Sequence, residues 1–252
     1  MKRKIGRNVL KFQNFEIDEG DYHVLNRMLT MARGNDGSAE IRTVERAVAE
    51  GAVVIGEENN DDKRITEFRP DDRSGFFRNG RIPNEIGELD GLREIRCFMR
   101  SDLARLPLGL FHLHNLKGLV LWNWPKLQEL PEEIGQLQNL EFLMLARCFG
   151  LTSIANSIGM LSSMKVLCLS GCQKLRSLPD EIGLLKNLET PDVSDCIKLE
   201  AIPDSIGHLS NLKRLDLLGC RRLTALPYSI GDLTCLESLS LDLDVVTQIP
   251  ES

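Results

Sequence analysis

Apolar residues recur along most of the chain with a period of 24 residues. When Leu140–Cys148 is aligned with Leu212–Cys220, both segments have apolar residues at offsets 0, 3 and 5 and a cysteine at offset 8. Each unit continues with an apolar residue at offset 11, Leu or Ile at offset 14, usually a following Pro, and an Ile-Gly-x-Leu run ending at offset 21. Self-similarity at this length predicts a solenoid of stacked units.

The start of each unit predicts one short strand. Successive strand residues point to opposite faces, so offsets 3 and 5 face the core while offsets 2, 4 and 6 face outward. A single unit buries too little apolar surface to offset its conformational entropy, so the strands of neighbouring units must pair. The expected fold class is α/β: a solenoid with a curved parallel sheet on the concave face, short helical or irregular returns on the convex face, and a small helical N-terminal cap.

The chain divides into three parts. Residues 1–20 have no sustained period and are expected to be a disordered lead-in. Residues 21–63 predict a cap, with one helix behind an Asp21 N-cap, a second helix from Ser38, a strand over Ala52–Ile55 and a charged linker. Residues 64–252 form the array: a degenerate first repeat over 64–91, six full repeats and a truncated last repeat from Leu236. The full repeats start at Leu92, Leu116, Leu140, Met164, Leu188 and Leu212.

Two features of the array depart from regular repetition. Pro191 occupies the inward offset 3, where its missing N–H removes a ladder hydrogen bond, so we expect the sheet to loosen there. The last repeat stops before its Ile-Gly-x-Leu run, which predicts a truncated array with Leu239, Leu241 and Ile249 on an uncapped edge. Such an edge favours self-association through the C-terminal end.

The array resembles the leucine-rich repeat family, over roughly residues 64–252. Its sequence motif Leu-Pro-x-x-Ile-Gly-x-Leu, with Cys at offset 8, is most similar to the repeats of plant intracellular disease-resistance (NB-LRR) proteins and of plant Ras-group leucine-rich repeat proteins. The resemblance implies a horseshoe whose sheet-lined face binds a protein partner, without catalysis, in signalling or defence. The chain has no Gly-x-x-x-x-Gly-Lys-Ser/Thr phosphate loop. The alternative is therefore a fragment of a nucleotide-binding leucine-rich-repeat receptor whose switch module is absent.

Charge and hydropathy exclude several classes of function. The net charge is −6, and residues 1–81 hold 15 basic and 15 acidic side chains, so the excess acid lies in the array. A nucleic-acid partner favours the opposite imbalance. Apolar runs are too short for a secretory core or a membrane span, which indicates a cytoplasmic protein, or a nuclear one if Lys2–Lys11 acts as an address. We expect no membrane association, no cofactor, no metal and no enzyme activity.

Cysteines recur at offset 8 as a column of four: Cys148, Cys172, Cys196 and Cys220. A metal site needs ligands that converge on one point, and a linear column does not converge. We expect small buried side chains whose weak donors serve backbone carbonyls. By register Cys97 belongs to the core, whereas Cys168 and Cys235 point outward and are the candidate reactive thiols.

The outward strand positions predict the partner-binding residues. At the N-terminal end of the array they form an apolar cluster, and towards the C-terminal end they become acidic. Contiguous exposed apolar surface with aromatic side chains at its centre is typical of interaction sites. An alternative interpretation is that the N-terminal helices cover this cluster, or that it fills the tight inner curve. The candidate residues are Phe98, Val120, Trp122, Phe142, Met144, Val166, Asp192 and Asp216.

Overall fold

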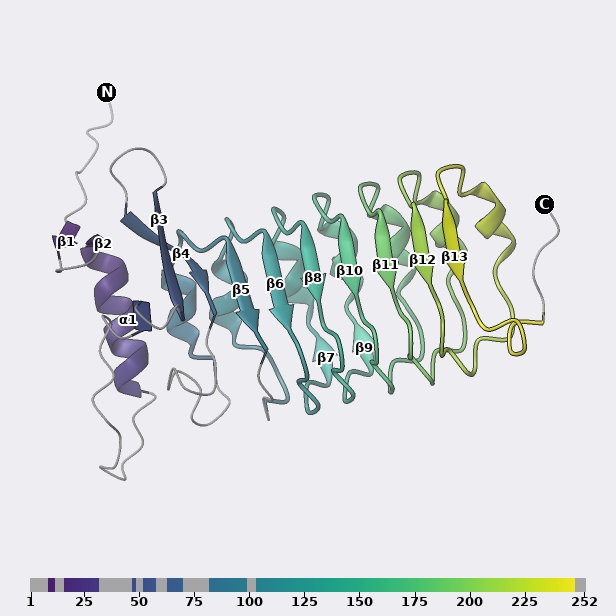
Figure 1. Cartoon of the computed structure of the whole chain (residues 1–252), viewed down its shortest axis with the longest axis horizontal. Helices are drawn as coiled ribbons and strands as arrows, with labels where there is room; N and C mark the ends of the chain where they lie inside the picture. The colour runs from purple at the N-terminus through teal and green to yellow at the C-terminus, as the bar shows by residue number, and fades with distance from the viewer. Residues whose placement is uncertain are drawn as a thin grey trace.

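A computed structural model shows a single curved array of stacked units (Figure 1). The structure describes residues 9–11, 16–31, 47–48, 52–57, 63–69, 82–98 and 103–247. One nine-stranded sheet runs through the array in the order β13-β12-β11-β10-β8-β6-β5-β4-β3. Its strands are β3 (Val53–Glu57), β4 (Lys63–Phe68), β5 (Glu94–Cys97), β6 (Gly118–Leu121), β8 (Phe142–Met144), β10 (Val166–Cys168), β11 (Thr190–Asp192), β12 (Arg214–Asp216) and β13 (Ser238–Ser240).

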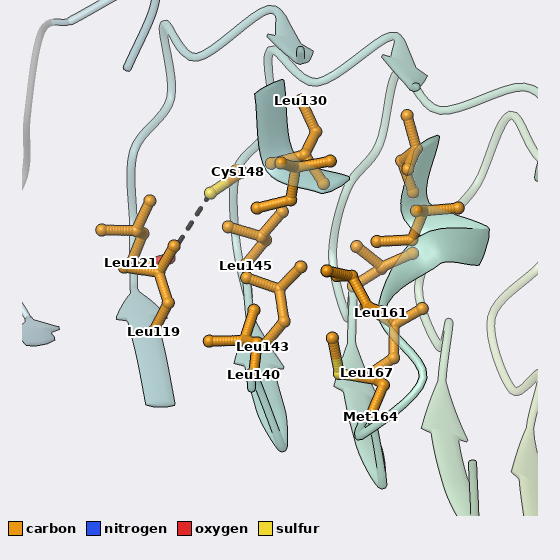
Figure 2. Packing of buried hydrophobic residues seen from close by; sticks show 14 of the residues in the cluster. Leu119, Leu121, Leu130, Leu140, Leu143, Leu145, Cys148, Leu161, Met164 and Leu167 are labelled. Carbon is orange, nitrogen blue, oxygen red and sulfur yellow. Dashed lines mark hydrogen bonds between the residues drawn. The ribbon is translucent and has the colours of Figure 1, made fainter. Parts of the chain in front are cut away.

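All neighbours from β4 to β13 pair in parallel, one strand per repeat, as the period predicts. Leu119 pairs with Leu143, and Leu143 pairs with Leu167, so residues 24 apart share one environment. Figure 2 shows these leucines packed in successive layers. They belong to one buried cluster that runs through the whole array.

Each return segment contains a short 3-10 helix, and these helices lie behind the sheet in Figure 1. A proline precedes six of the seven, and Ala155 takes its place before η4, with φ between −65° and −80° at all seven positions. Proline is pre-set for this φ and needs no hydrogen-bond partner for its nitrogen. The helices are η1 (Asn84–Glu88), η2 (Leu108–His112), η3 (Glu132–Gln136), η4 (Asn156–Met160), η5 (Asp180–Leu184), η6 (Asp204–His208) and η7 (Tyr228–Asp232). In two repeats a further short strand lies along the chain between the sheet strand and the 3-10 helix. These two strands, β7 (Glu129–Leu130) and β9 (Ser153–Ile154), pair with each other.

An α-helix covers the N-terminal end of the core. α1 (Glu19–Met31) buries Val24, Leu25 and Met28, and it packs beside η1. It begins three residues before the predicted start, because Asp18 takes the place of Asp21 as the capping residue: the Asp18 Oδ1 accepts the Asp21 N–H at 3.1 Å. The helix therefore caps the end of the array, as expected.

Asp21 has a different role from the predicted N-cap. Its carboxylate is buried and accepts hydrogen bonds from Arg64 Nε at 2.9 Å, Arg64 Nη2 at 2.6 Å and Ile65 N at 2.7 Å. Arg64 also pairs with Asp90. This network ties α1 to the strand β4 and to the first repeat.

The segment before the array has more regular structure than the sequence predicts. β1 (Val9–Lys11) and β2 (Glu16–Asp18) form an antiparallel pair within the expected lead-in. The strand expected at Ala52–Ile55 is β3, which pairs antiparallel with β4. β4 in turn pairs in parallel with β5, so it serves as the strand of the degenerate first repeat. Most of the predicted second helix, and residues 58–62 of the predicted linker, lie outside the described residues.

Pro191 reduces pairing on one side of its strand. β10 and β11 align through three residue pairs, whereas β11 and β12 align through Asp192 and Asp216 alone. The ladder N–H groups at offset 5 donate towards the following repeat, as from Val193 N to Asp216 O at 3.0 Å. By strand alternation the nitrogen at offset 3 faces the same way, so proline removes a bond to β12. The predicted loosening is confirmed at this interface.

Candidate partner-binding face

The register of the sheet sets up the outward columns as predicted. Glu94, Gly118, Phe142, Val166 and Thr190 are successive partners at offset 2. Arg96, Val120, Met144, Cys168, Asp192 and Asp216 are successive partners at offset 4. The sheet therefore presents both columns on one continuous face.

Five of the six apolar candidates reach the surface. Phe98 is 55% exposed and Val166 is 37% exposed, while Trp122, Phe142 and Met144 are half-buried. Val120 is only 5% exposed, and its expected role as a contact residue is corrected. In the offset-4 column this short side chain lies between two longer ones, those of Arg96 and Met144.

Two contacts hold the aromatic side chains of this cluster. The Phe142 ring lies over Gly118 of the preceding repeat, in the space that a Cβ at Gly118 would occupy. The Arg147 guanidinium carbon lies 5.8 Å from the centre of the Trp122 ring, within reach of a cation–π interaction. Both aromatics are thus fixed before any partner arrives. An anchor fixed in this way loses little conformational entropy on binding.

The acidic end of the face is hydrogen-bonded within itself. Asp192 Oδ1 accepts bonds from Ser194 N at 2.9 Å and Ser194 Oγ at 2.6 Å, and its Oδ2 accepts the Cys168 thiol at 3.4 Å. Asp216 Oδ1 accepts the Leu218 N–H at 3.1 Å. Asp192 is therefore largely occupied by the fold, and Asp216 is the more available of the two predicted carboxylates.

Comparisons with known proteins agree with the repeat architecture of the chain. A family model described as a leucine-rich repeat region matches residues 154–249. The chain has the leucine-rich repeat fold. No curated protein sequence matches it.

Several solved structures align over most of the chain. The leucine-rich repeat domain of the type III effector XopL is 22% identical, with a TM-score of 0.52, over 92% of this chain and 98% of that domain. Internalin C2 from Listeria monocytogenes is 17% identical, with a TM-score of 0.51, over 78% of this chain and 90% of that one. A plant ice-binding protein is 18% identical, with a TM-score of 0.52, over 89% and 88% of the two chains. At these identities the likeness concerns the fold alone.

The cysteine column belongs to the framework of the leucine-rich repeats. Each thiol donates to the carbonyl 27 residues earlier, at distances of 3.2–3.5 Å. Figure 2 shows one of these bonds, from Cys148 to Leu121. Burial raises the pKa of Cys148 and Cys196 to about 12 and that of Cys220 to about 11. The predicted structural role, as donors to backbone carbonyls, is confirmed.

The two candidate reactive thiols differ. Cys168 is buried, and its burial, together with the nearby Asp192 carboxylate, raises its pKa to about 11, so it is held as a thiol. Its expected reactivity is corrected. Cys235 is exposed. Among the described residues no group of three His, Cys, Asp or Glu side chains is arranged to hold a metal ion, and no described helix is long and apolar enough to cross a membrane.

Sequence reasoning missed two side-chain ladders that link neighbouring leucine-rich repeats. In the first, the asparagine before the repeat start donates to the carbonyl 25 residues earlier, at 2.8–2.9 Å, from Asn115, Asn139, Asn187 and Asn211. In the second, Glu141 pairs with Lys117 at 3.2 Å and with Lys165 at 2.8 Å, and both lysines lower its pKa. Both ladders leave a signal in the sequence. In the first, asparagine recurs at one fixed offset, and in the second, basic and acidic residues alternate at one fixed offset.

The sequence also contains a signal for the backbone conformation at one position of the repeat, which the pattern of apolar residues does not show. The residue at offset 7 has positive φ in five successive repeats, at 56° to 76°. Asn, Gly and Asp are the residue types that tolerate this region, and they fill four of the five positions. The five residues are Asn123, Arg147, Gly171, Asp195 and Gly219.

Proposed function

We propose that this protein is a non-catalytic scaffold that binds a protein partner on its concave sheet face. The observation that carries the proposal is the apolar cluster of Phe98, Trp122, Phe142, Met144 and Val166, which spans neighbouring repeats from β5 to β10. Large aromatic anchors in fixed positions are the residues on which protein-binding energy usually concentrates. The partner supplies the apolar side chains that complete this cluster.

The acidic half of the face adds selectivity. Asp216 lies beside Asp192, and Asp242 follows in the next repeat, where its Oδ2 accepts the Gly219 N–H at 2.8 Å. A row of carboxylates attracts a basic region of the partner and mainly raises the rate of encounter. We therefore expect a partner with an apolar patch next to lysines or arginines, and with its association weakened by salt.

The outward columns of the sheet fit the surface of a protein partner better than a surface with a regular repeat, such as a crystal lattice. At offset 2 the side chain changes at every repeat, from Glu94 through Gly118 and Phe142 to Val166 and beyond. A lattice such as ice repeats at a fixed interval, and a matching face would repeat the same side chain. The varied columns favour one particular macromolecular partner.

The cellular role follows from the resemblance of the repeats. The repeat motif shared with plant disease-resistance and Ras-group proteins supports a role in signalling or defence, in the cytoplasm or the nucleus. All seven cysteines are free, which favours a reducing compartment. The alternative, favoured by the same repeat motif, is that the chain is the sensing fragment of a nucleotide-binding leucine-rich-repeat receptor.

The test uses the full chain as bait, with Trp122→Ala and Phe98→Ala variants and Tyr228→Ala as the matched control. Tyr228 is an exposed aromatic residue on η7, away from the concave face. Partners captured by the wild type are identified and titrated by calorimetry. We expect each concave variant to lose about 2 kcal/mol of binding free energy, roughly 30-fold in affinity, with its circular dichroism unchanged. Equal affinity of all three variants overturns the proposal.

A further inference from the structure

The row of 3-10 helices on the convex side holds a second exposed apolar pair. Met160 ends η4 and Leu184 ends η5, and each is 57% exposed. The two helices are neighbours in the array. Met160 Sδ lies 2.9 Å from the position of a Cβ at Gly135, and Leu184 Cδ1 lies 3.0 Å from the corresponding position at Gly159. Each side chain therefore folds back over the preceding repeat, and together they make an apolar strip over η3 to η5.

The other repeats show that packing does not require apolar residues here. The same last position of the 3-10 helix holds Glu88, His112, Gln136, His208 and Asp232 in the other five helices. All seven helices have the same length and begin from the same extended backbone. Exposing Met160 and Leu184 to water is thus a property of these two repeats and not of the fold.

Acidic side chains flank this strip. The first turns of the surrounding helices carry Glu132 and Glu133 on η3, Asp180 and Glu181 on η5, and Asp204 on η6. Glu132 Oε2 accepts the Ser157 N–H at 3.0 Å. The nearby Lys186 donates to the carbonyls of Gly183 and His208, both at 2.9 Å, and offsets one of the five charges. The surroundings remain net negative.

We propose that the convex strip of Met160 and Leu184 is a second docking surface, for a basic amphipathic segment of a partner protein. The apolar side chains of such a segment cover the strip, while its lysines or arginines lie against the carboxylates of η3, η5 and η6. An anionic membrane or a nucleic acid is repelled by the same carboxylates. This surface is on the opposite side from the concave face, so both partners can be held at once.

The methionines allow both faces to be observed in one sample. In the full chain with methyl-labelled methionine, Met160 reports on the convex strip, Met144 reports on the concave face and Met164 is buried. The probe is a short peptide with Leu and Lys at helical spacing, and its counterpart with Glu in place of Lys is the control. We expect the Lys peptide to shift the Met160 methyl signal saturably while the Glu peptide leaves it unchanged.

Two variants then measure the contribution of the strip. Leu184→Gln introduces the residue type that η3 carries at this position and should weaken peptide binding about fivefold or more. Gln136→Leu extends the strip by one repeat and should strengthen binding by a similar factor. A shift at Met144 with none at Met160, or equal dissociation constants for both variants and the wild type, overturns the proposal. Either outcome leaves the concave-face function to its own test.

Discussion

The Phe142 ring and the Cα of Gly118 lie against each other on the concave face, one repeat apart. A Cβ at Gly118 would overlap the ring atoms Cζ, Cε1 and Cε2, so glycine at this position is what makes room for the ring. The residues are direct register partners of β6 and β8. The shape of the proposed binding face therefore depends on a residue that contributes no side chain to it.

This relationship predicts a coupled effect of two substitutions. Gly118→Ala should cost about 1–3 kcal/mol of unfolding free energy, because the ring must leave its position. In a Phe142→Leu background the same substitution should cost much less, since the overlapping ring atoms are gone. Chemical denaturation of the four proteins gives the coupling energy. Additive effects within ~0.3 kcal/mol would show that the ring does not depend on Gly118.

Pro191 predicts a stabilising substitution. Pro191→Leu restores the residue type of the neighbouring strands and an N–H that can donate to β12. We expect a gain of about 1 kcal/mol in unfolding free energy, the value of a typical backbone hydrogen bond. Amide hydrogen exchange should also slow at Asp216 and its neighbours in β12. Leu167→Ile, at the same offset in β10, serves as a control for a simple change of apolar side chain.

The repeat phase could be predicted from sequence because burial enforces it at every unit. A leucine at offset 3 or 5 has no alternative environment, so the strands, the columns and the cysteine bonds all followed from one alignment. The exposure of an outward residue is different, since it depends on how large its neighbours are. Val120, whose column neighbours are Arg96 and Met144, is buried although its offset faces outward.

The N-terminal cap was harder to predict because it lies outside the repeat. Asp18 and Asp21 are both plausible capping residues by type, and only the position of Arg64 in the fold decides between them. A contact between residues 43 positions apart leaves no periodic signal in the sequence. The convex strip was missed for another reason: Met160 and Leu184 occupy a position whose residue type varies from repeat to repeat, so the period does not mark it.

The glycines predict a graded series that separates strain from overlap. Gly171 has φ of +73° but no atom closer than 3.5 Å to a Cβ, so Gly171→Ala should cost about 1 kcal/mol from backbone strain alone. A Cβ at Gly207 would lie 2.5 Å from the Ser229 carbonyl oxygen, so Gly207→Ala should cost more, about 2–3 kcal/mol. Gly231 has open space around it, and Gly231→Ala should be neutral or stabilising. Thermal and chemical denaturation of the three variants would contradict this account if their order were reversed.

The buried pair of Asp21 and Arg64 predicts how firmly α1 is held. Asp21→Ala leaves the Arg64 guanidinium buried beside fewer acceptors, and this should cost about 3–5 kcal/mol. Arg27 pairs with Glu88 at the surface, so Arg27→Ala should cost less than about 1 kcal/mol. Hydrogen exchange in α1 measures whether the loss is local to the cap or spreads into the array. Similar costs for both substitutions would show that burial of the first pair has no energetic weight.

The cysteine column predicts both reactivity and alkaline sensitivity. Of the seven thiols, Cys235 is the exposed one, so iodoacetamide should label one cysteine in the native protein at pH 8 and all seven after unfolding. Burial raises the pKa of Cys148, Cys196 and Cys220 from 9.0 to about 11 or 12 in the folded state. A group whose pKa is raised by folding stabilises the fold fully below its unfolded pKa, and this stabilisation is lost as pH rises through the folded value. The unfolding free energy should therefore fall between about pH 9 and pH 12 and fall less steeply in a Cys148→Ala, Cys196→Ala double variant. An unchanged alkaline slope in that variant would show that other groups cause the loss.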